Sequence, residues 1–181
     1  MVLQEQQLAP DFRLPAVGDD DAAVITYVRL AQLRGKLVLI MFVPKGDRRG
    51  NALEIGGFRA VHQALRERGV TVFVISTATL TTQKQFVVHY HLPFQLLSDT
   101  DATVARAYGV WIEKRLFGKP YQGVERTTML IDQEGKLRKI WRRIRPEGHA
   151  EEVLAFVETL FGPLTSSTAV SDGMMKAPLP L

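Results

Sequence analysis

Few residues of this sequence have the type and spacing for covalent or metal chemistry. Ser76, Thr77 and Thr79 follow a predicted strand, but no base or nucleophile-elbow motif accompanies them. His89 and His91 are separated by one residue, so they lie on different sides of a helix and are not expected to share a metal. The chain has no cysteine, which excludes disulfides, thiolate metal sites and every cysteine-nucleophile mechanism. We therefore expect neither a metal nor a cofactor.

Two pairs of polar residues have the spacing of helix starts. Asn51 followed by Glu54 suits a capping-box-like arrangement, with Asn51 as the N-cap and Glu54 at the third helical position. Asp99 and Asp101 are expected as turn formers before a short helix. His149 is expected on a helix surface or at a helix cap. These readings assign structural roles to the residues and no chemistry.

The strongest element signals lie in the first half of the chain. The apolar run 37–43 predicts a strand that is buried on both faces, and 70–75 repeats the signal. Between them Phe58, Val61 and Leu65 recur at helical spacing. A strand, a helix and a strand over this distance predict a right-handed crossover with two parallel neighbouring strands.

The remaining signals complete an α/β domain, a mixed β-sheet flanked by helices. The composition changes after about residue 161, so we expect one domain over 1–161 and a flexible C-terminal tail over 162–181. The other expected elements are strands at 12–15, 24–30 and 95–98, helices at 81–91, 102–108 and 149–160, and a hairpin of 127–132 with 136–144.

An ordered set of short motifs runs from Ala9 to Leu160. The motifs are Ala9-Pro10-Asp11-Phe12-x-Leu14-Pro15, Leu33-Arg34-Gly35-Lys36, Phe42-x-Pro44-Lys45, Leu92-Pro93-Phe94, Leu96-Leu97-Ser98-Asp99, Tyr108-Gly109-Val110, Gly123-Val124-Glu125-Arg126, Thr128-x-Leu130-Ile131-Asp132 and Gly148-His149-Ala150-Glu151-Glu152-Val153-Leu154. Together they resemble the Q-type peroxiredoxins, the bacterioferritin-comigratory proteins of the AhpC/TSA group. This resemblance implies a thioredoxin-like fold of the peroxiredoxin type. It also implies thioredoxin and hydroperoxides as partners and a monomer or weak homo-oligomer.

The catalytic motif of that family is only partly kept. Its pattern is proline, three residues, threonine or serine, two residues and then the peroxidatic cysteine. Pro44 holds the proline position, but Arg48 stands at the hydroxyl position and Asn51 at the cysteine position. The resolving cysteine of many members lies five residues later, where this chain has Gly56. The nucleophile, its hydroxyl partner and its resolving partner are all replaced.

The supporting residues of the family are retained, because Glu54 and Arg126 match its glutamate and its second-site arginine. A carboxamide has no ionisable nucleophile near neutral pH, so the chain is predicted to be inactive as a thiol peroxidase. One interpretation is a vestigial pocket. The other is an anion or carboxylate site formed by Arg126, the backbone N–H groups near Asn51 and Arg48, since Arg48 and Arg49 make the loop more positive.

The leading hypothesis is thus a degenerate Q-type peroxiredoxin homologue, a pseudoenzyme that acts as a binding or regulatory module. An alternative is a thioredoxin-dependent peroxidase, an antioxidant oxidoreductase, whose cysteines are substituted in this chain. A third is a scaffold or oligomerisation role. Changes at Arg48, Arg49 and Gly56 as well as Asn51 argue against a simple engineered knockout, which would alter only the sulfur.

Composition limits the partners further. The 181 residues carry 23 Lys and Arg against 19 Asp and Glu, a net charge of +4. The basic segment 138–145 contains one aromatic residue, Trp141, and nucleic-acid sites need more aromatic side chains for stacking. We therefore expect a solvated strand edge and not a nucleic-acid site.

No apolar run approaches the roughly 20 residues that cross a bilayer, and the first ten residues lack a signal-peptide pattern. We expect a cytoplasmic setting without membrane contact.

Overall fold

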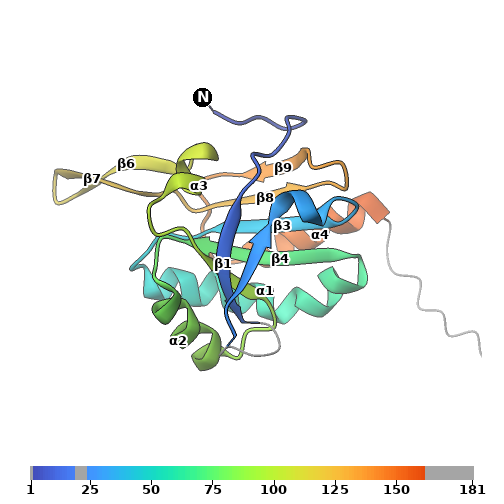
Figure 1. Cartoon of the computed structure of the whole chain (residues 1–181), viewed down its shortest axis with the longest axis horizontal. Coiled ribbons are helices and arrows are strands. Elements are labelled where there is room, and N and C mark those ends of the chain that lie inside the picture. Colours follow the sequence, from blue (N-terminus) through green and yellow to red (C-terminus); the bar gives the residue numbers. More distant parts are fainter. Residues whose placement is uncertain (1, 19–23, 162–181) are drawn as a thin grey trace, which may run out of the picture.

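A computed structural model describes residues 2–18 and 24–161 of the chain, so the predicted tail 162–181 lies outside the described residues. A seven-stranded mixed sheet with the order β2-β1-β5-β4-β3-β8-β9 forms the centre of the molecule (Figure 1). The predicted α/β fold class is confirmed. The strands are β1 (Arg13–Gly18), β2 (Thr26–Arg29), β3 (Leu37–Phe42), β4 (Val70–Ser76), β5 (Gln95–Ser98), β8 (Thr127–Ile131) and β9 (Leu137–Trp141).

The middle of the sheet follows the predicted order. All six residues of β3 are buried, because both faces of this strand are covered. β3 and β4 are parallel neighbours, and β8 pairs with β3 in the antiparallel sense. β8 and β9 form the predicted antiparallel hairpin. The carboxyl ends of β3 and β4 therefore lie at one edge of the sheet, directly before the loops that begin α1 (Arg48–Glu67) and approach α2 (Leu80–Tyr90).

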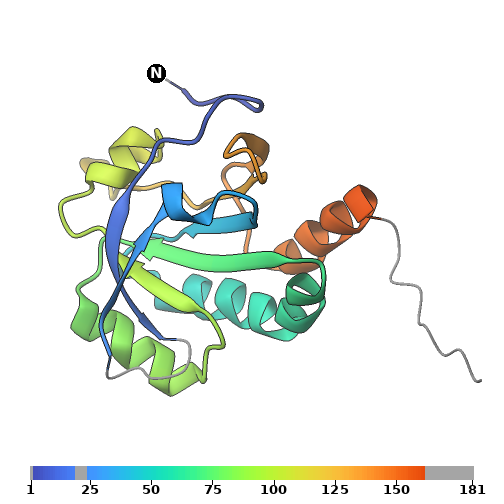
Figure 2. The same ribbon diagram turned by 45° about the vertical axis from the view of Figure 1, so that its right-hand side comes forward.

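Helices cover both faces of the sheet (Figures 1 and 2). α1, α2 and α4 (His149–Phe161) bury Phe58, Val87 and Val153 in one apolar cluster. The short helices η1 (Leu30–Leu33) and α3 (Thr103–Ala107) pack on the opposite face, in a second cluster. In Figure 2 the two sets of helices stand on opposite sides of the strands, so the molecule has three layers.

One element of the structure is missing from the sequence prediction. β6 (Trp111–Leu116) and β7 (Lys119–Val124) form a separate two-stranded antiparallel hairpin that projects from the body of the molecule (Figure 1). No strand was expected from the sequence between residues 111 and 124, so this hairpin was missed. Most side chains of the hairpin are exposed or half-buried, so no apolar alternation marks its strands.

The basic edge strand β9 is covered in part by the N-terminal segment. The N–H of Gln6 donates to the carbonyl of Leu137 at 2.7 Å, and the N–H of Leu137 donates to the carbonyl of Gln7 at 2.8 Å. Lys139 lies 3.7 Å from the carboxylate of Glu5. These contacts protect an exposed edge from pairing with other chains. Among the described residues, no helix combines the length and apolar character needed to span a bilayer.

Candidate functional site

The site begins at the N-terminus of α1. Asp47 is the N-cap, and its Oδ1 accepts a hydrogen bond of 3.0 Å from the N–H of Gly50. Asn51 lies in the first turn of α1, so the prediction of Asn51 as N-cap with Glu54 at the third helical position is wrong. Aspartate and asparagine cap equally well. Asp47 is the cap in this structure because its carboxylate has a second partner, the distant Arg126.

Asn51 joins the helix to the preceding loop. Its Nδ2 donates a hydrogen bond of 2.9 Å to the carbonyl of Pro44. The structure therefore brings together the two motif positions occupied by Pro44 and Asn51. The Oδ1 atom of Asn51 is buried and has no hydrogen-bond partner among the described residues. An unpartnered buried acceptor lowers the stability of the folded state. Such an atom is typical of a position that is not optimised for stability alone.

Arg126 precedes β8 and is only 7% exposed. Its Nη1 donates to Oε2 of Glu54 at 2.5 Å, and its Nη2 donates to Oδ2 of Asp47 at 2.7 Å. The guanidinium thus lies between two carboxylates, one of which the sequence analysis did not include. The signal that could have found Asp47 is its position three residues before Gly50, the spacing between a cap and the N–H that donates to it.

The charges of this cluster are compensated inside the protein. Burial raises the pKa of Glu54, and Arg126 opposes that effect. The N–H of Gly50 and the charge of Arg126 lower the pKa of Asp47. Lys114, carried by the β6–β7 hairpin, has a pKa lowered by burial and by Arg126. An external anion would have to displace the Asp47 carboxylate before it could bind Arg126. The charge count of the loop does not include this competition.

Glycine is required at one position of the helix start. A Cβ atom on Gly50 would lie 2.2 Å from Oδ2 of Asp47 and 2.7 Å from Nη2 of Arg126. Gly56, at the resolving position, has no neighbouring atom within 4 Å of such a Cβ. Both glycines lie in the continuous helix α1, together with Asn51. Gly50 therefore makes room for the Asp47–Arg126 ion pair, whereas Gly56 has no packing role of that kind.

A polar chain continues from Glu54 in α1 through Thr128 in β8 to His149 at the start of α4. The hydroxyl of Thr128 interacts with Glu54 and lowers its pKa, and it lies 2.9 Å from Nε2 of His149. Nδ1 of His149 lies 3.2 Å from the carboxylate of Glu152. His149 is only 2% exposed, so the expectation of a surface or capping histidine is wrong. Its burial lowers its pKa, and Glu152 opposes that effect.

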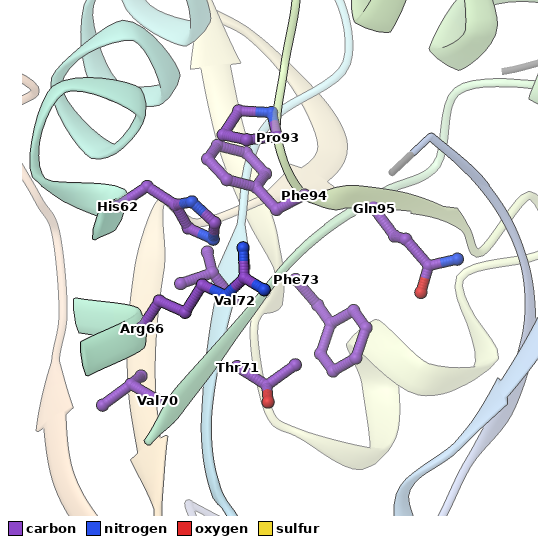
Figure 3. A pocket seen from close by; sticks show the side chains of 9 residues that line it. All are labelled: His62, Arg66, Val70, Thr71, Val72, Phe73, Pro93, Phe94 and Gln95. Carbon is purple, nitrogen blue, oxygen red and sulfur yellow. The ribbon is translucent and has the colours of Figure 1, made fainter. Parts of the chain in front are cut away.

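Arg48 does not join the Arg126 cluster through any hydrogen bond or ion pair of the described residues. It lines a separate cavity of about 520 Å³ between α1 and α2, together with Lys45 and Asn51. A smaller cavity of about 300 Å³ lies near the other end of α1, where the side chains of His62 and Arg66 face Val72 (Figure 3). The predicted anion site thus divides into a filled cluster at Arg126 and an open cavity at Arg48.

Among the described residues, no group of three or more His, Asp or Glu side chains could hold a metal ion.

The three-layer fold with its mixed sheet is that of a peroxiredoxin with a thioredoxin-like core. Solved structures agree: the bacterioferritin comigratory protein of Xanthomonas campestris superimposes with a TM-score of 0.73 and 29% identity, over 81% of this chain and 91% of that one. Peroxidoxin BcpB of Mycobacterium tuberculosis gives a TM-score of 0.73 and 28% identity, over 87% of this chain and 98% of that one.

The sequence comparisons define the family. The AhpC/TSA family profile matches residues 6–140. The chain is 42% identical over 154 residues to a putative peroxiredoxin Bcp of Coxiella burnetii, covering 85% of this chain and 98% of that protein. It is 35% identical to peroxiredoxin Bcp of Bacillus subtilis over 85% of this chain and 94% of that protein. The chain belongs to the AhpC/TSA family, with peroxiredoxins of the Bcp type as relatives, and it lacks cysteine.

Proposed function

We propose that this chain is a member of the AhpC/TSA family that does not reduce hydroperoxides and acts as a non-redox binding module. The observation that carries the proposal is the state of the nucleophile position. Asn51 occupies it, and the amide donates its N–H to Pro44. The whole sequence contains no cysteine that could act in its place.

The chemistry of the family explains why this substitution is decisive. A thiolate attacks one oxygen of a hydroperoxide, the O–O bond breaks, and the products are a sulfenic acid and an alkoxide that takes up a proton. The sulfur supplies the electron pair and is oxidised. A carboxamide nitrogen or oxygen has no comparable nucleophilic electron pair near neutral pH, and neither a helix N-terminus nor a guanidinium provides one.

The rest of the site is maintained without that reaction. Arg126 is paired with Glu54 and Asp47, and Pro44 lies against Asn51. These contacts favour a fixed helix start, since each polar group except one oxygen of Asn51 and one of Glu54 has a partner. The binding role follows from the open cavity beside this start, because a cavity of about 520 Å³ falls within the range of small-molecule sites.

A peroxide-consumption assay tests the proposed inactivity. Wild-type protein with thioredoxin, thioredoxin reductase and NADPH is expected to consume hydrogen peroxide and an alkyl hydroperoxide no faster than the buffer. Turnover above that control would overturn the proposal.

A restored thiol provides the positive arm of the test. Asn51→Cys is expected to form one sulfenic acid per chain, which dimedone traps for mass spectrometry, because the new thiol lies beside the Arg126 cluster at the helix start. Gly56→Cys is the matched control, since that thiol lies in the same helix with no neighbour within 4 Å. Equal oxidation of the two variants would contradict the view that the site around Asn51 is retained.

A further inference from the structure

The cavity between α1 and α2 lies beyond the carboxyl ends of β3 and β4. Val43 and Ser76 line it from the ends of these strands, and Lys45 and Arg48 line it from the loop and the first turn of α1. In open α/β sheets, ligands bind in the crevice outside the carboxyl ends of the strands. The cavity is distinct from the Arg126 cluster, since neither Arg126 nor Glu54 lines it.

The rim of the cavity is cationic. Lys45 and Arg48 line it and have no hydrogen bond from their side chains and no ion pair among the described residues, and His89 adds a third basic side chain. No aspartate or glutamate of the described chain lines the cavity. The nearest capping carboxylate, Asp47, is held by Gly50 and Arg126. The positive charges at the rim therefore lack an internal counter-charge.

The inner wall of the cavity is apolar and aromatic. Phe86 and Tyr90 lie with their ring centroids 4.4 Å apart, next to Ile55 and Leu96. Two polar groups of this wall differ: Nε2 of Gln83 already donates to the carbonyl of Leu97, whereas Oδ1 of Asn51 has no partner among the described residues. A ligand body that meets the rest of the wall gains from ring contacts and burial of apolar area.

We infer that this cavity binds a small organic anion with a planar aromatic body, its carboxylate or sulfonate facing Lys45 and Arg48 and its ring against Phe86 and Tyr90. The inference deepens the proposed function, because it names the ligand class of the binding module. It also explains a departure from the family pattern. Arg48 stands where the family carries threonine or serine, so the cavity has gained a cation at its rim.

Two fluorescent probes that differ in one group test the inference. The anion is 8-anilino-1-naphthalenesulfonate, and its neutral counterpart is N-phenyl-1-naphthylamine, which has the same rings without the sulfonate. The folded wild-type protein is expected to bind the anion saturably with one site per chain, about tenfold more tightly than the neutral probe. Equal affinity for the two probes would overturn the inference, because the cationic rim would then have no role.

Charge-reversal variants locate the site. Lys45→Glu/Arg48→Glu is expected to raise the dissociation constant of the anion about tenfold and to leave that of the neutral probe unchanged. The matched control is Arg49→Glu/Arg66→Glu, which changes the net charge equally. Arg49 does not line the cavity, and Arg66 lines the separate cavity of Figure 3. The control is expected to change the dissociation constant less than about twofold through long-range charge alone.

The outcomes separate the two proposals. Loss of binding in the control variant alone would place the anion in the cavity of Figure 3 and overturn the inference. Equal loss in both variants would mean that the probe follows net charge, which also overturns it. A failure here combined with no peroxide turnover leaves the proposed inactivity standing. Peroxide turnover by the wild type overturns the proposed function whatever the probes bind.

Discussion

Two buried carboxylates of this molecule are held in different ways. Asp99, before α3, accepts hydrogen bonds from the N–H groups of Val104 at 3.1 Å and Ala105 at 2.8 Å. Glu54, in α1, is held by the guanidinium of Arg126, and its Oε1 has no hydrogen-bond partner among the described residues. Both carboxylates are 1% exposed, and burial raises the pKa of each.

The difference separates a structural carboxylate from one that belongs to a site. Asp99 finds its partners five and six residues along the chain, and both of its oxygens are used. Glu54 depends on a residue 72 positions away and leaves one oxygen unpartnered. Stability alone favours the first arrangement, because local backbone donors satisfy a carboxylate without a buried cation. The second arrangement is typical of a functional site.

Removing the cation tests this distinction most strongly. Arg126→Met is expected to lower the free energy of unfolding by about 3–5 kcal/mol near neutral pH, because it leaves Glu54 as an uncompensated buried charge. Urea unfolding measures the loss. Arg126→Met/Glu54→Gln, which removes the charge as well, is expected to recover part of it. A loss below about 1 kcal/mol for Arg126→Met would show that water reaches Glu54 and that the pair is not buried in solution.

Removing the local carboxylate gives the next largest effect. Asp99→Ala is expected to lower the free energy of unfolding by about 2 kcal/mol, since it leaves the N–H groups of Val104 and Ala105 unsatisfied. Unfolding of the double variant Arg126→Met/Asp99→Ala measures whether the two regions are independent. We expect the losses to add within about 0.5 kcal/mol. A larger deviation would mean that the two carboxylates belong to one network.

Alanine at two glycines of α1 should have effects of opposite sign. Gly50→Ala places a Cβ against Asp47 and Arg126, so we expect a loss of about 1–2 kcal/mol from the strained contact. Gly56→Ala meets no atom within 4 Å, so we expect a gain of about 0.5–1 kcal/mol from helix propensity. Thermal unfolding of the two variants measures both changes. Equal stabilisation by both would show that Asp47 leaves Arg126 without cost.

The parts of the fold that the sequence predicts are those with a regular apolar pattern. β3 and β4 are continuous buried runs, and their parallel pairing follows from the helix between them. The β6–β7 hairpin escapes prediction because it projects from the body and buries few side chains. Its contribution to the Arg126 cluster through Lys114 is therefore also missed.

The site was predictable where a motif fixes the residue and unpredictable where a long-range contact decides. The motif positions single out Glu54 and Arg126, but their ion pair was not predicted and comes from the structure. The helix start was misplaced from Asp47 to Asn51 because both residues are good caps, and the ion pair that selects Asp47 spans 79 positions. His149 was misplaced because its neighbours Phe58, Trp141 and Thr128 lie on other elements.

The pH dependence of stability gives the smallest effect in this comparison. Asp47 and Glu54 share Arg126, but the pKa of Asp47 is lowered and that of Glu54 is raised. The pKa of Asp47 is lowered from 3.8 by the N–H of Gly50 and by Arg126. Its contribution is therefore present above pH 3.8 and is lost as the pH falls through the lowered pKa. The pKa of Glu54 is raised from 4.5 by burial, so its contribution is present below pH 4.5 and is lost as the pH rises.

Two single variants separate these contributions. Asp47→Asn is expected to cost about 0.5–1 kcal/mol at pH 6, because the side chain is half exposed and its ion pair is screened, and to cost less as the pH falls below 3.8. Glu54→Gln is expected to show the reverse trend, with stability relative to the wild type improving as the pH rises from 4.5. Urea unfolding between pH 3 and 7 measures both. Parallel pH profiles of the two variants would mean that the pKa values of Asp47 and Glu54 are shifted in the same direction, which contradicts the burial of Glu54.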